Sequence, residues 1–112
     1  MPAQAGALEA QTAPTAPAGG TAIQSLIEAR KYPEAETILR GRLKAHEAAG
    51  AMGSPAAASD AETLAFVLSM TKRAEEAEPL IRAAVRTRER LGDDRATGRS
   101  LNRLASILLV LA

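Results

Sequence analysis

The sequence predicts an all-α protein, an antiparallel helix-pair solenoid of about two and a half repeats that follows a disordered N-terminal tail. Three observations support this prediction. The chain repeats itself in a fixed register, its apolar content is mostly Ala and Leu with only 2% aromatic residues, and helix start and stop signals recur along it. A period between about 20 and 50 residues is typical of stacked repeats. Small aliphatic side chains suit helices that approach one another closely.

The repeat is clearest around the tripeptide Glu-Ala-Glu, which occupies residues 34–36 and again residues 76–78. We call the offset from Glu34 to Glu76 the repeat interval. Three further residues recur unchanged at this interval, as Arg40/Arg82, Glu47/Glu89 and Gly50/Gly92. Four aliphatic positions recur as aliphatic, namely Leu26/Leu68, Ile38/Leu80, Leu39/Ile81 and Leu43/Val85. Because polar and apolar positions recur together, each copy is expected to be one structural unit that packs on the next.

Composition divides the chain into a tail and a repeat region. Residues 1–20 consist mainly of Ala, Pro, Gly, Gln and Thr, and a segment with so few large apolar side chains is expected to be disordered. The repeats are expected over residues 21–112. The boundaries are 21–50 for the first repeat, 59–92 for the second and 95–112 for an incomplete third.

Local signals place the helix boundaries. Capping boxes at Thr21-Ala-Ile-Gln24 and Ser59-Asp-Ala-Glu62 are expected to open two helices. Pro33 suits the first turn of another helix, and Gly50 and Gly92 are expected to end helices. Pro79 is expected to bend a helix without ending it. The expected helices are 21–30, 33–49, 59–70, 73–91 and a last one from about residue 94 to residue 112.

The spacing of small and large residues resembles that of the tetratricopeptide repeat. Leu64-Ala65-x-x-Leu68 is followed by Ala77, Ile81 and Ala84, and Leu104-Ala105-x-x-Leu108 begins the same pattern again. The segments 73–80, 91–94 and 100–105 are especially similar to the 42-residue variety found in kinesin light chains and many bacterial proteins. The resemblance covers residues 21–112. It is weaker in the first repeat, where Ile23 and Arg42 replace small residues, which suggests an N-terminal cap.

The resemblance implies a concave groove lined by the first helix of each pair. The partner-binding residues that it implies are Glu62, Phe66, Arg99, Asn102 and Arg103. Asn102 matches an Asn that hydrogen-bonds the ligand backbone in the kinesin-light-chain type. Arg95, Arg99 and Arg103 are four residues apart, so they share one helix face that could bind an acidic peptide. The alternative for these arginines is a solvated face, and the alternative for Phe66 is packing between repeats.

Other classes of function are disfavoured by what the sequence lacks. There is no Cys and only one His, His46, so neither a metal site nor a cofactor is expected, and the protein is not expected to be an enzyme. A net charge of +1 gives no general attraction for nucleic acid or anionic membranes. If residue 1 is the true start, the absence of a signal peptide predicts a cytoplasmic protein.

The expected function is therefore a non-catalytic scaffold or adaptor that binds a peptide or a partner protein in its groove. Two alternatives stay open, because residues 107–112 are almost wholly apolar and would leave an exposed face. The chain could be a regulatory repeat fragment of a larger bacterial signalling protein or enzyme. It could also self-assemble, for example as a homodimer through the C-terminal helix. As a test of the fold, Ala77→Leu is expected to overpack a helix crossing, whereas Ala57, expected to be exposed, should tolerate Leu.

Overall fold

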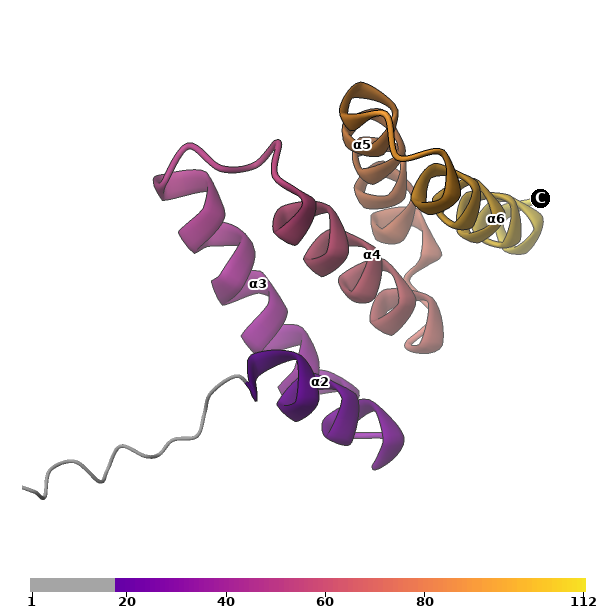
Figure 1. Cartoon of the computed structure of the whole chain (residues 1–112). Coiled ribbons are helices and arrows are strands. Elements are labelled where there is room, and N and C mark those ends of the chain that lie inside the picture. Colours follow the sequence, from indigo (N-terminus) through magenta and orange to yellow (C-terminus); the bar gives the residue numbers. More distant parts are fainter. Residues whose placement is uncertain (1–17) are drawn as a thin grey trace, which may run out of the picture. The chain divides into compact units, whose positions relative to one another are not determined.

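The computed structural model describes residues 18–112, and over this range the chain is all-helical, as predicted (Figure 1). The helices are α2 (Ala18–Glu28), α3 (Tyr32–Ala48), α4 (Pro55–Met70), α5 (Ala74–Leu91) and α6 (Asp94–Leu111). The tail expected over residues 1–20 lies outside the described residues except for its last three, which belong to α2. Among the described helices, none combines the length and apolar character that crossing a membrane requires.

The chain divides into two units near the start of α3, with Ala35 as the last residue of the first unit and Glu36 as the first residue of the second. In the second unit α4 packs against α5, and α5 packs against α6 (Figure 1). The short turn between α4 and α5 makes these helices antiparallel, as in a helical hairpin. Pro79 lies inside α5, which continues past it to Leu91.

Two helices begin earlier than the capping boxes predicted. α2 begins at Ala18, before Thr21. α4 begins at Pro55, and its N-cap is Ser54, whose Oγ accepts a hydrogen bond from the Ala57 backbone N–H at 3.1 Å. Proline suits the first helical position because its missing N–H is not needed there. The Ser-Pro pair therefore starts α4, and the box beginning at Ser59 lies inside the helix.

The backbone repeats in the same register as the sequence. Arg30 and Lys72, which are one repeat interval apart, both adopt the left-handed conformation, with φ of 60° and 63°. Gly50 and Gly92, also one repeat interval apart, have φ of 68° and 77°. At each of the four positions the following N–H bonds a carbonyl five residues back, as in Lys31 to Leu26 and Arg73 to Leu68. This is the Schellman helix ending, so the chain ends corresponding helices in the same way in both copies.

The core of the second unit is built from the aliphatic repeat positions. Leu64, Leu68 and Ile81 are fully buried, and so are Ala65 and Ala77, the small residues expected where α4 and α5 cross. Burying each large aliphatic side chain contributes roughly 1.5–3 kcal/mol. One expectation is wrong. Ala57 is only 1% exposed, because α4 starts early enough to carry this residue into the core.

Candidate functional site

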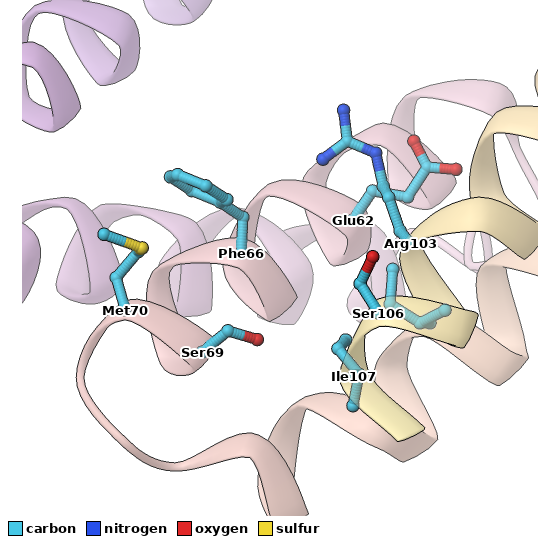
Figure 2. Close-up of a pocket in the computed structure, with 8 residues that line it drawn as sticks. Glu62, Phe66, Ser69, Met70, Arg103, Ser106 and Ile107 are labelled. Atoms are coloured by element: carbon cyan, nitrogen blue, oxygen red, sulfur yellow. The ribbon is translucent and has the colours of Figure 1, made fainter. Parts of the chain in front are cut away.

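The first helices of the second and third repeats, α4 and α6, border a hollow of about 280 Å³ whose wall also includes Ile81 of α5. Figure 2 shows Phe66 and Met70 on α4 and Ser106 and Ile107 on α6. Ser69, Glu62 and Arg103 complete the lining. Phe66 is 39% exposed and Met70 is 47% exposed, so both offer apolar surface to a ligand.

The hollow brings together three of the five residues that the family resemblance implied. Glu62, Phe66 and Arg103 line it, whereas Arg99 and Asn102 are exposed on α6 outside its lining. The backbone carbonyl of Asn102 accepts a hydrogen bond from the Ser106 hydroxyl at 3.2 Å. The partner-binding roles of all five residues stay predictions.

The Glu62 carboxylate forms hydrogen bonds with side chains of two neighbouring helices. Its carboxylate accepts bonds from Arg88 on α5 at 3.3 and 3.4 Å, and it also accepts a bond from the Ser100 hydroxyl on α6. Arg88 is buried and bonds the Ser59 hydroxyl at 3.0 Å as well. Since this network joins α4, α5 and α6, the first role of Glu62 is to neutralise a buried arginine rather than to attract a cationic ligand.

The arginines of α6 differ from Arg88, because they are exposed at the surface. Arg99 and Arg103 are exposed, and neither forms an ion pair or a side-chain hydrogen bond within the part of the chain that the structure describes. Arg103 lies at the hollow, and Arg99 lies one helical turn before it. With the Glu62 carboxylate occupied by Arg88, the charge left at this face is positive.

A second polar cluster, which the sequence did not reveal, lies between α3 and α4. Asp60 is only 6% exposed. Its carboxylate lies 2.9 Å from His46 Nε2 and 3.3 Å from two guanidinium nitrogens of Arg42. Burying a carboxylate is costly unless it is paired, so these contacts explain why an Asp is tolerated here. Among the described residues, no side-chain hydroxyl bonds the His46 ring.

A third cluster joins α3 to the start of α5. Glu36 bonds Arg40 at 2.8 Å and also bonds Arg73, and Arg40 reaches Glu76 at 3.2 Å. The hydrogen bond from Arg40, aided by Arg73, outweighs partial burial and lowers the pKa of the Glu36 carboxyl below its usual value. The matching pair in the second repeat, Glu78 and Arg82, has the same 2.8 Å bond. The two copies therefore share this ion pair as well as their helix endings.

No protein-family model, curated protein sequence or solved structure matches this chain. Among the described residues, no three His, Cys, Asp or Glu side chains are grouped as a metal site would require.

A second hollow, of about 330 Å³, lies on the other side of α4. Its lining is Arg40, Leu43, Lys44, Glu47, Met52, Leu64 and Leu80. Arg40 already forms ion pairs with Glu36 and Glu76. None of the five residues predicted to bind a partner lines this hollow. The hollow beside Phe66 is the better candidate because three of the five residues predicted to bind a partner line it.

The residues that sequence reasoning missed carry a weak signal. Asp60 follows Ala57 by three residues and precedes Leu64 by four, so it lies on the apolar stripe of its helix. His46 and Arg88 occupy corresponding positions, one repeat interval apart, and both pair with a carboxylate of α4. A basic residue therefore recurs at one repeat position, and an acidic residue of α4 lies opposite it in each copy. This pattern could have indicated the His46–Asp60 and Arg88–Glu62 pairs.

Proposed function

We propose that this protein is a non-catalytic binding module of the tetratricopeptide-repeat kind, which captures an acidic, partly apolar segment of a partner protein in the hollow between α4 and α6. The observation that carries the proposal is that exposed Phe66 and Met70 lie at one hollow with Arg103, which has no ion pair within residues 18–112. An apolar surface next to an unpaired cation fits a ligand that carries an apolar and an acidic side chain close together.

The size of the hollow is compatible with the side chains of a peptide. Pockets that enclose whole small molecules run from about 300 to 1,000 Å³, and this one, at about 280 Å³, lies just below that range. One or two side chains of an extended or helical peptide would fill it. The arginines of α6 would then hold acidic residues that flank the buried side chain, and Asn102 is available to bond the peptide backbone. Because the helices are formed before binding, less ordering entropy is lost.

The repeat supports this assignment. Helix endings, buried alanines and the Glu–Arg pair all recur from one copy to the next, as expected of stacked helix pairs. In such proteins the first helices of successive pairs line the ligand face. The candidate hollow lies between two of these first helices, α4 and α6.

A displayed library of random peptides, selected on the whole protein, would test the proposal. Enriched peptides are expected to combine acidic and large apolar residues. Their affinity, measured by fluorescence anisotropy, should fall about tenfold or more for Arg103→Glu and for Phe66→Ala, since each change removes a contact worth about 1.4 kcal/mol or more. Arg86→Glu, an exposed charge on α5, is the control and should bind as the wild type does. Peptides without acidic residues, or equal binding by all three variants, would contradict the proposal.

A further inference from the structure

The sulfur atoms of this chain are all methionine thioethers, because the sequence contains three Met and no Cys. Methionine is therefore the side chain on which reversible sulfur oxidation can take place. Met1 lies outside the described residues. Met52 and Met70 are 46% and 47% exposed, so a small oxidant dissolved in water reaches both side chains to a similar extent.

The two described methionines differ in what they line. Met70 is the last residue of α4 and lines the hollow between α4 and α6, whereas Met52 precedes α4 and lines the second hollow. Figure 2 shows Met70 on the same side of α4 as Phe66, which lies one helical turn before it. Since these two side chains supply the exposed apolar surface of the hollow, a change in the polarity of Met70 changes the character of the candidate binding site.

Oxidation would make exactly such a change, because it converts the thioether into a polar sulfoxide. One oxygen atom of a peroxide is transferred to Sδ, which loses two electrons, and the other oxygen leaves as water. Reduction by two thiols, which become a disulfide, removes the added oxygen as water and restores the thioether.

The lining of the hollow offers little to compensate a buried sulfoxide. Among the residues that line it, only Ser69, Ser106 and Arg103 carry side-chain hydrogen-bond donors. Both serine hydroxyls already donate to backbone carbonyls of their own helices, at 2.9 Å to Ala65 and 3.2 Å to Asn102. A sulfoxide covered by an apolar ligand would thus lose its water without gaining a partner, or it would take the Arg103 guanidinium away from an acidic group of the ligand. Either outcome weakens binding.

We propose that Met70 is a reversible oxidation site that controls the hollow: peroxide converts it to the sulfoxide and releases the bound segment, and reduction restores binding. This inference rests on the proposed function. It concerns the surface of α4 and leaves the core intact, because the nearby Val67 and Leu68 are 0% exposed. Far-ultraviolet circular dichroism is therefore expected to be the same before and after oxidation.

The test uses the whole protein and an acidic, apolar peptide selected from the displayed library. Affinity is measured by fluorescence anisotropy before and after treatment with hydrogen peroxide, with mass spectrometry to confirm the sulfoxide at Met70. The wild type should lose about fivefold or more in affinity, as expected for an uncompensated polar group, and should regain it with a methionine sulfoxide reductase. Met52→Leu is the matched control and should lose as much as the wild type. Met70→Leu, compared with its own untreated form, should lose nothing.

Three results would overturn the proposal. They are full binding by wild-type protein that carries the Met70 sulfoxide, an equal loss of binding in oxidised Met70→Leu, and a loss of helical signal that accompanies the loss of binding. Any of these leaves the proposed function standing, because the untreated protein still binds the peptide. A library that yields no acidic, apolar peptide would instead contradict the proposed function, and this inference with it.

Discussion

Glu62→Ala is expected to destabilise the protein by about 3 kcal/mol, although Glu62 lines the candidate binding hollow. The change removes the carboxylate that neutralises Arg88, whose side chain is only 10% exposed. Breaking a buried ion pair from one side costs about 3–5 kcal/mol, because the remaining charge stays buried without a partner. The Glu62 side chain is itself 15% exposed, and its bonds to Arg88 are 3.3 and 3.4 Å long, so the lower end of this range applies.

Urea unfolding followed by circular dichroism measures this loss. With a slope of about 1–3 kcal/mol per molar urea, the midpoint should fall by about 1–3 M. Glu75→Ala removes an exposed carboxylate of α5 without a described ion pair and is the control. It should change the free energy of unfolding by less than about 0.5 kcal/mol.

The double variant Glu62→Ala/Arg88→Met provides the decisive comparison. It removes both charges, so it should be more stable than Glu62→Ala alone, as found when buried ion pairs are replaced by apolar residues. If Glu62→Ala unfolds at the wild-type urea concentration, Glu62 does not neutralise Arg88 and is free to bind a ligand. If the double variant is the less stable one, the reasoning from an uncompensated charge is refuted.

Three further predictions concern the repeat. Ala77→Leu should cost about 1–3 kcal/mol by overpacking a site that is 0% exposed, whereas Ala56→Leu, at an exposed position, should change the unfolding free energy little; equal effects would contradict the crossing. Gly92→Ala should lower the free energy of unfolding and Lys72→Gly should raise it, each by about 1 kcal/mol or less, because both positions have positive φ; changes of the same sign would argue against these conformations. Glu36 has a lowered pKa in the folded state, so its stabilisation is present above the ordinary carboxyl pKa and is lost as pH falls through the lowered value. The urea midpoint of Glu36→Gln should therefore fall less steeply than that of the wild type as pH is lowered below the ordinary carboxyl range.

The helical fold was predictable because its causes are local and repeated. Gly50 and Gly92 end helices as predicted, since glycine adopts the left-handed conformation without a steric penalty. The starts of helices were harder to place. Ser54-Pro55 and Ser59-Asp60-Ala61-Glu62 are both valid start signals, and the choice between them depends on which residues α5 and α3 bury.

By itself, the sequence determined that the chain is helical, that it repeats in a fixed register and that Ala65 and Ala77 lie in its core, although it misplaced Ala57. These features follow from backbone preference and side-chain size, which act over a few neighbouring residues. Only the tertiary structure decided that Glu62 forms an ion pair with Arg88 and that Asp60 pairs with His46 and Arg42. It also decided that Arg103 has no partner among the described residues. The first two pairings join residues 14 to 26 positions apart, and electrostatic pairing depends on distance in space. A charge pattern along the chain therefore names the charged residues, and helix packing determines which of them remain available to a ligand.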